Sequence, residues 1–196
     1  DGVYQINSGL DVYVRTTGWG VNPWSAGTWG SKADLSLTNQ LRTWSIDNFG
    51  DDTLAAPRGG PIYFWDESTG LSTRATLLSA ESGASDVPTN VIQVMTSDVD
   101  KHCIAFGFNP RGTTAKDPLL LRFSDRESAV DWTPTATNQA GGVQLSQGSE
   151  IIGALRTRQE ILIWTDVGIV SMRFVGEPFI FSFTEVAEGQ SLIAPN

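Results

Sequence analysis

The chain has 196 residues, of which 40% are apolar and 18% charged, with 20 Gly, nine Pro and seven Trp. This composition excludes a disordered chain and, without a long helical pattern, favours an all-β domain with many turns. The formal net charge of −9 argues against binding of nucleic acid through a basic face. No apolar run approaches the roughly 18 residues that a membrane helix requires.

Residues 1–40 differ from the rest of the chain in being rich in glycine and tryptophan. Val12–Arg15 fits a strand, and Trp19, Trp24 and Trp29 follow at five-residue intervals among glycines. Such rings can stack on sugars, or they can bury against a neighbouring subunit or domain, where Trp is enriched. The adjacent glycines favour close backbone packing, so we predict that the three Trp residues lie in an interface, with sugar binding as the alternative.

Residues 41–196 show three successive units of alternating apolar and polar residues, at about 41–80, 91–146 and 147–190. The first unit is predicted to contain strands at Thr43–Phe49, Leu54–Pro57, Ile62–Trp65 and Thr73–Leu78. The second is predicted at Val91–Thr96, Cys103–Phe108, Leu119–Phe123 and Val130–Thr133, with Val143–Ser146 leading into the third unit. The third is predicted at Ile151–Thr157, Ile161–Thr165, Ile169–Val175 and Phe179–Phe183. Four-stranded antiparallel meanders of this size form propeller blades or parts of sandwiches.

A short motif recurs in the three units. PIYFWD ends at Asp66, LLRFSD at Asp125 and ILIWTD at Asp166, and each Asp can accept a backbone N–H two residues on. The spacings are 125 − 66 = 59 and 166 − 125 = 41 residues. A propeller blade takes about 40–50 residues, so the second spacing fits and the first needs an insertion. The motif resembles the aromatic–Asp that closes the third strand of WD-type blades, without the Gly-His partners. We therefore predict a partial β-propeller of about three blades.

Few residues offer the chemistry of a metal or redox site. Cys103 is the only cysteine and is predicted to be a buried, inert thiol. His102 is the only histidine and is predicted at the surface or at a strand edge. Asp98 and Asp100 could offer oxygens to calcium, but without a Gly-centred loop and a bidentate Glu a solvated turn is favoured.

Paired carboxylates are the main enzymatic possibility, because glycoside hydrolysis needs two carboxyl groups at a defined separation. The candidate pairs are Asp51/Asp52, Asp66/Glu67 and Asp125/Glu127. All three fall in predicted turns, where acidic residues serve the backbone. Ser124–Glu127 could also begin a single helical turn, with Ser124 as N-cap and Glu127 at the capping-box position. Ser25–Trp29 keeps only the end of a sialidase-type repeat and lacks its Asp. We predict no catalytic, cofactor-binding or metal-binding residues.

Several segments together resemble virion proteins of tailed bacteriophages, namely the propeller-containing tail nozzle or packaged-DNA stabilisation proteins of podophages. They are GLDVYVRTTGWG with GTWGS, LRTWSIDNFGDD, GGPIYFWD, DPLLLRFSDRESAVDWTPTATNQAGG, LSQGSEIIGALRTRQEILIWTD and FIFSFTEVAEGQSLIAPN. The resemblance implies that residues 1–40 end an inserted β domain and that the chain is a piece of a longer polypeptide with further blades.

The resemblance also implies a function. It implies a non-enzymatic component of the virion tail, nozzle-like or hub-like, without a cofactor. Copies of it would form a six- or twelvefold ring around the DNA exit channel, in contact with portal, adaptor or other tail proteins. DNA would pass without sequence-specific binding, since an acidic wall does not retain it electrostatically. The alternative is a receptor-binding or carbohydrate-binding propeller at the tail tip.

Overall fold

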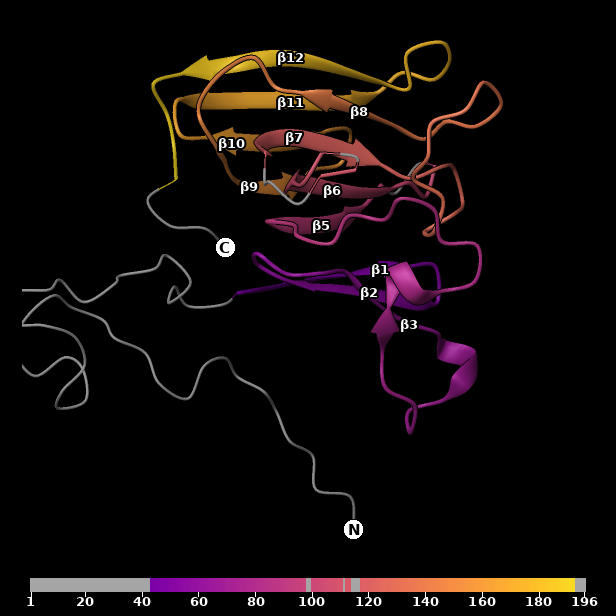
Figure 1. Ribbon diagram of the computed structural model, residues 1–196. Helices are drawn as coiled ribbons and strands as arrows, with labels where there is room; N and C mark the ends of the chain where they lie inside the picture. The colour runs from indigo at the N-terminus through magenta and orange to yellow at the C-terminus, as the bar shows by residue number, and fades with distance from the viewer. Residues whose placement is uncertain (1–42, 98–99, 111, 114–116, 193–196) are drawn as a thin grey trace, which may run out of the picture. The chain divides into compact units, whose positions relative to one another are not determined.

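The computed structural model describes residues 43–97, 100–110, 112–113 and 117–192, which form three four-stranded antiparallel sheets (Figure 1). Sheet 1 contains β1 (Trp44–Phe49), β2 (Asp52–Pro57), β3 (Tyr63–Trp65) and β4 (Thr76–Leu77). Sheet 2 contains β5 (Gln93–Thr96), β6 (Cys103–Phe108), β7 (Asp117–Phe123) and β8 (Gly141–Gln144). Sheet 3 contains β9 (Ile151–Arg156), β10 (Ile161–Thr165), β11 (Gly168–Phe174) and β12 (Phe181–Glu188). Short 3₁₀ helices lie at η2 (Glu67–Thr69) and η3 (Leu78–Ala80).

In each sheet, strands that follow one another in the chain are neighbours, so each sheet is a simple meander. The all-β prediction and the three four-stranded units are confirmed. Within the described residues no helix has the length and hydrophobicity needed to cross a membrane. The predicted segment 1–40 and its tryptophans, Trp19, Trp24 and Trp29, lie outside the described residues.

The predicted fourth strand of the second unit, Val130–Thr133, is wrong, because β8 takes that place at Gly141–Gln144. Trp132 is instead fully buried and donates its indole N–H to Ala129 O at 2.8 Å. Asp131 forms an isolated parallel bridge with Ser85. This segment is thus anchored to the loop after sheet 1, and the later, glycine-containing segment pairs with β7.

The helical turn predicted at Ser124–Glu127 is also wrong. The Ser124 hydroxyl accepts a hydrogen bond from Cys103 N at 2.8 Å instead of capping a helix. Glu127 has a φ of 55°, a left-handed conformation that cannot continue a right-handed turn. The residues after β7 therefore form an irregular turn.

The recurring Asp occupies two different places in the sheets. Asp66 and Asp125 follow the third strands β3 and β7, but Asp166 follows β10, which is the second strand of sheet 3. The spacing of 41 residues therefore does not measure a structural repeat. The predicted turn chemistry holds for Asp66, whose Oδ1 accepts Ser68 N at 2.8 Å. Asp166 Oδ1 instead accepts Ser149 N at 2.7 Å, from the turn before β9.

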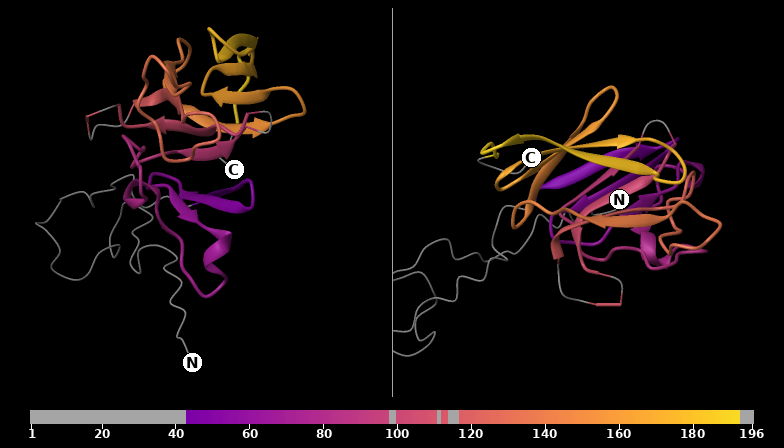
Figure 2. Two further views of the ribbon diagram at one scale, coloured as in Figure 1. Left: turned by 90° about the vertical axis from the view of Figure 1, so that its right-hand side faces the viewer. Right: turned by 90° about the horizontal axis from the view of Figure 1, so that it is seen from above.

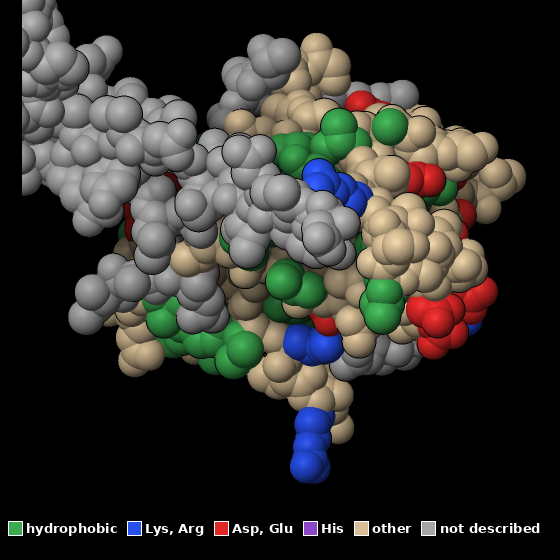
Figure 3. Space-filling view, turned by 90° about the horizontal axis from the view of Figure 1, so that it is seen from below, with side chains coloured by type: hydrophobic (Ala, Val, Ile, Leu, Met, Phe, Trp, Pro, Cys, Tyr) green, Lys and Arg blue, Asp and Glu red, His purple; other side chains and the backbone are tan. Residues whose placement is uncertain are grey.

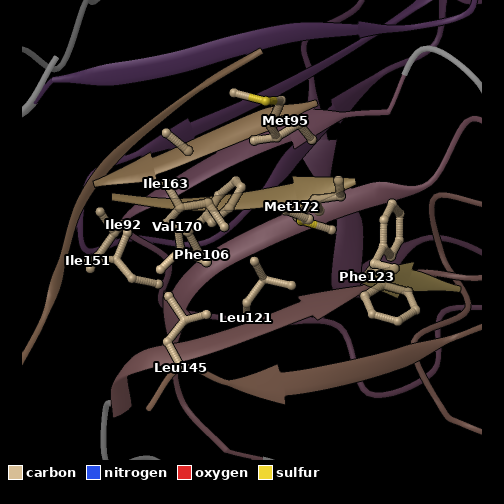
Figure 4. Packing of buried hydrophobic residues seen from close by; sticks show 14 residues of the cluster. Ile92, Met95, Phe106, Leu121, Phe123, Leu145, Ile151, Ile163, Val170 and Met172 are labelled. Carbon is tan, nitrogen blue, oxygen red and sulfur yellow. The ribbon is translucent and has the colours of Figure 1, made fainter. Parts of the chain in front are cut away.

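Two hydrophobic clusters join the three sheets, with sheet 2 in the middle. The cluster between sheets 2 and 3 includes Phe106, Leu121, Ile151, Ile163 and Met172, whose side chains point toward one another in Figure 4. A second cluster packs sheet 1 against the other face of sheet 2 and includes the fully buried Leu54, Val91, Ala105, Phe108 and Trp132. Sheet 2 is therefore covered on both faces, whereas sheets 1 and 3 each have one face without a partner among the described residues.

The first strands of the sheets are cross-linked by polar side chains. On β1, the Ser45 hydroxyl accepts Val94 N at 3.0 Å, and Asp47 Oδ2 accepts Thr96 N at 2.8 Å. Val94 and Thr96 belong to β5, an edge strand whose outward N–H groups have no partner within its own sheet. Side chains of sheet 1 thus accept hydrogen bonds from the N–H groups at the open edge of sheet 2.

Similar contacts join sheet 2 to sheet 3. Gln93 Nε2 on β5 donates to Ala154 O at 2.9 Å, and Gln93 Oε1 accepts Ala154 N at 2.8 Å. Arg156 Nη1 on β9 reaches back to Asp47 Oδ2 at 3.1 Å. The strands β1, β5 and β9 therefore meet at a common centre, from which the sheets diverge in the left view of Figure 2.

Candidate functional site: an acidic cleft

An open cleft of about 440 Å³ lies at the end of sheet 1 where the β1–β2 turn meets η2 and the loops that flank sheet 2. Its lining residues are Phe49, Gly50, Asp51, Asp52, Asp66, Glu67, Ser68, Lys101 and Glu127. Five of these are acidic and one is basic, so the cleft carries a net negative charge. Tertiary structure therefore gathers residues from all three acidic pairs that the sequence singles out.

Two of the cleft carboxylates hold the local backbone in place. Asp66 caps η2 by accepting Ser68 N, and Asp52 Oδ1 accepts Glu67 N at 3.1 Å. These bonds fix the first turn of η2 beside the β1–β2 turn. The prediction that these acids occur in turns for backbone reasons is confirmed for Asp66, whereas Asp52 is the first residue of β2 and serves the backbone of η2 from there.

The third acidic pair is divided by the fold. Glu127 lines the cleft, but Asp125 does not. Asp125 Oδ1 accepts Arg126 N at 2.8 Å and Gln139 N at 2.7 Å, so it joins the turn after β7 to the loop before β8. Its carboxylate is therefore committed to the backbone, as the turn interpretation predicts.

The cleft attracts cations in general but has no arrangement that selects one. Among the described residues, no three His, Cys, Asp or Glu side chains lie close enough together to hold a metal ion. Lys101 is the only basic residue in the lining and would be the first group to meet an anion. The arrangement is thus a negatively charged surface feature at one end of sheet 1.

His102 lies in the interior, so its predicted position at the surface or at a strand edge is wrong. Its side chain is fully buried, and Nδ1 lies 2.8 Å from Ser124 O. The ring packs edge-on against Phe123 and Phe181, with centroids 5.9 and 5.5 Å away. The polar turn before it gave no sign of this burial, which arises because sheet 3 covers the start of β6.

Two neighbours of His102 are also buried. Cys103 is fully buried, as predicted, and burial raises the pKa of its thiol, with the charge of Asp47 adding to the effect. Asp100 is buried rather than solvated, and its Oδ1 lies 3.6 Å from Arg126 Nη2. Asp98, the other residue considered for calcium, lies outside the described residues.

A second candidate site, missed by sequence reasoning, is the outward face of sheet 1. Trp44 and Ile46 on β1 are 51% and 67% exposed, and Leu77 on β4 is also exposed. The Trp44 ring lies beside Tyr63 on β3, with centroids 6.1 Å apart. In Figure 3 hydrophobic side chains gather on the side of the molecule where sheet 1 lies. The alternation of WSIDNF could have revealed this face, because Trp44 and Ile46 occupy one side of the strand and Phe49 the other.

Comparison with known proteins adds no family to these observations. No protein-family model matches the chain, and no curated protein matches it. The resemblance to phage tail proteins therefore stays a prediction from the sequence.

Proposed function

We propose that this chain is a non-enzymatic structural protein of a bacteriophage tail, similar to a nozzle or hub, and that its three sheets are blades of a β-propeller. Copies of the chain would assemble in a ring around the DNA exit channel of the virion. The observation that carries the proposal is the repeated contact between consecutive four-stranded meanders, each packed face to face on the next, with their first strands at a common centre.

The arrangement of the first strands supports the propeller. In a β-propeller, four-stranded sheets surround a central channel, and each blade packs on its neighbour. Here β1, β5 and β9 approach one another, and side chains of one sheet bond to the edge strand of the next. The alternative, two sheets of a sandwich, does not account for a third sheet that packs in the same way on the second.

Rigidity supports the structural role. Side-chain and backbone hydrogen bonds fix the turns at Asp66, Asp125 and Asp166, and the two clusters hold sheet 2 on both faces. A tail part must transmit force and keep a channel open, and short strands with fixed turns suit this better than mobile helices.

The charge of the chain supports a channel through which DNA passes. The net charge of −9 and the cleft formed by Asp51, Asp52 and Glu67 would repel phosphates and so avoid retaining DNA. We propose that this acidic end of sheet 1 faces the channel. An assembled structure with these carboxylates on its outer wall would contradict that orientation.

Native mass spectrometry with negative-stain images of the assembly that contains this chain would test the proposal. A closed ring, six- or twelvefold and attached to a portal or tube, is the expected result. A monomer, or a trimer of the kind found in fibres, would overturn it and would favour the receptor-binding alternative at the tail tip.

A further inference from the structure

We infer that the outward face of sheet 1 binds the outward face of sheet 3 of a second copy of this chain, head to tail. This inference rests on the propeller proposed above and names the two sheet faces through which a second copy would complete it. It starts from β1, on which the large apolar side chains of Trp44 and Ile46 face outward and are exposed.

In β1, Trp44, Ile46 and Asn48 lie on the outward side, and Ser45, Asp47 and Phe49 lie on the inward side. Ser45 and Asp47 face sheet 2, where they accept N–H groups of β5, whereas Trp44 and Ile46 are exposed. Across the sheet Ile46 pairs with Ala55, which pairs with Tyr63, which in turn pairs with Leu77. Directly paired residues of antiparallel strands share a face, so these side chains form one apolar row.

A two-layer sheet in water normally shows the opposite pattern, with apolar residues toward the core and polar residues outward. The same face also carries Trp44, next to Tyr63. Contiguous exposed apolar and aromatic side chains of this kind mark interaction surfaces. We therefore take this row as one side of an interface, whose other side is not supplied by the described residues.

The outward face of sheet 3 offers that other half. Leu155 on β9 is 51% exposed and pairs directly with Leu162 on β10, while Trp164 is half-buried and pairs with Ile169 on β11. All of these residues lie on the side of sheet 3 opposite the core that it shares with sheet 2. The outward faces of sheet 1 and of sheet 3 thus both carry apolar side chains.

The order of the sheets indicates how the two faces would meet. Ser97 of the β5–β6 loop lies beside Thr157–Glu160 of the β9–β10 turn, and Lys101 of the same loop lies beside the β1–β2 turn. The three turns therefore lie at one end of the sheets. If another sheet 1 packed on sheet 3 in the same way, its exposed Asp51 would lie near the exposed Arg158. These two charges are opposite in sign.

A second copy is the partner that these observations favour, because one chain carries both complementary halves. The contact would repeat the face-to-face packing that joins sheet 1 to sheet 2 and sheet 2 to sheet 3. A head-to-tail contact of this kind closes into a ring when its rotation allows, and otherwise extends as a filament.

The test uses the full chain with Ile46→Arg, which blocks the sheet 1 face, or Leu155→Arg, which blocks the sheet 3 face. Sedimentation or native mass spectrometry should show that either variant weakens self-association at least about tenfold. Leu71→Arg is the matched control, since Leu71 is 93% exposed in the loop between β3 and β4, and it should leave self-association unchanged. Far-ultraviolet circular dichroism checks that each variant is folded.

A mixture of the two variants is decisive. Each retains one intact face, so an equimolar mixture should recover a 1:1 complex that neither variant forms alone. A mixture as weakly associated as the single variants would overturn the inference. So would a wild-type chain that stays monomeric at about 100 μM, because this concentration is well above typical dissociation constants of specific complexes.

The remaining outcomes separate this inference from the proposed function. If the ring forms in the virion and Ile46→Arg does not disturb it, the inference fails while the tail role stands. If wild-type chain binds glycans and Trp44→Ala abolishes that binding without affecting self-association, the face is a sugar platform and the inference also fails.

Discussion

The strands β6 and β1 show how differently two neighbouring sheets use the same backbone pattern. All six residues of β6, CIAFGF, are buried, because sheet 2 is covered by sheet 1 on one face and by sheet 3 on the other. In β1, WSIDNF, every second residue is exposed, and the exposed ones include Trp44 and Ile46. A continuous apolar run thus marks a sheet with two partners, whereas apolar residues on an outward face mark a sheet that lacks one.

The two strands should contribute differently to stability. Side chains of β6 contribute to folding of the isolated chain, while outward side chains of β1 contribute little until a partner covers them. Four substitutions, from the largest expected effect to the smallest, test the contributions of buried, cross-linking and exposed residues.

Phe106→Ala removes the largest side chain that β6 contributes to the core between sheets 2 and 3. Because Phe106 is fully buried, we expect the free energy of unfolding to fall by about 3–5 kcal/mol. Urea denaturation followed by tryptophan fluorescence measures it, with Leu71→Ala as the exposed control. A loss below about 1 kcal/mol would mean that sheet 2 is not the centre of the core.

Asp47→Ala breaks the link between the first strands. It removes the acceptor of Thr96 N and the ion-pair partner of Arg156, whose side chain is only 33% exposed. We expect a loss of about 1–3 kcal/mol, since Thr96 N loses its acceptor and Arg156 loses this carboxylate while keeping its bond to Thr96 O. The control is Arg173→Ala, which breaks the more exposed pair with Glu160 and should cost less than about 1 kcal/mol. Equal losses of unfolding free energy in both variants would argue against a special role in stability for the place where β1, β5 and β9 meet.

Lowering the pH should destabilise the loop at Val130–Thr133, the segment for which a strand was predicted. The hydrogen bond from the Ser85 hydroxyl to Asp131, at 2.6 Å, lowers the pKa of Asp131, with further bonds from Asn138 and Thr133. A lowered folded pKa stabilises the protein above the ordinary Asp value of 3.8, and this stabilisation disappears as the pH falls through the folded pKa.

Asp131→Asn should therefore flatten the fall in the free energy of unfolding as the pH drops below the ordinary Asp pKa of 3.8. Urea midpoints measured at several pH values for the wild type and the variant give the two slopes. Parallel slopes would show that Asp131 does not contribute to the acid sensitivity.

Ile46→Ala should have the smallest effect. Ile46 is 67% exposed, so the unfolding free energy of the monomeric chain should change by no more than about 0.5 kcal/mol. Leu54→Ala on the neighbouring strand, fully buried on the inward face, should cost about 2–5 kcal/mol. If Ile46→Ala is as costly as Leu54→Ala, its side chain is already covered in the monomer, and the outward face is not open.

Local sequence patterns predicted most strands because each strand is bounded by residues with strong turn preferences. Asp166-Val167 separates β10 from β11, which begins at Gly168, and Gly176-Glu177-Pro178 ends the extended run after β11. The alternation of apolar residues was sufficient to predict β9 and β10 within one residue at each end. The failure at Val130–Thr133 arose because a β-prone sequence with a buried Trp also suits a packed loop.

The candidate site was predictable in its residue types but not in its grouping. The acidic pairs were evident, and their turn chemistry follows from where Asp is favoured. The cleft brings Glu127 toward Asp51 and Asp66 and leaves Asp125 out, which depends on the left-handed residue Glu127 and on how sheet 2 packs on sheet 1. No short-range pattern encodes a contact between residues so distant in the chain.

The sequence by itself determined the all-β class, the three meanders and the burial of Cys103, because these depend on alternation and turn residues within a few positions. Tertiary structure alone decided which strand completes sheet 2, that His102 lies inside, and that Trp44 and Ile46 of β1 face outward. These depend on which sheet covers which face, and that choice is made by long-range packing and by polar links such as Asp47 to Arg156.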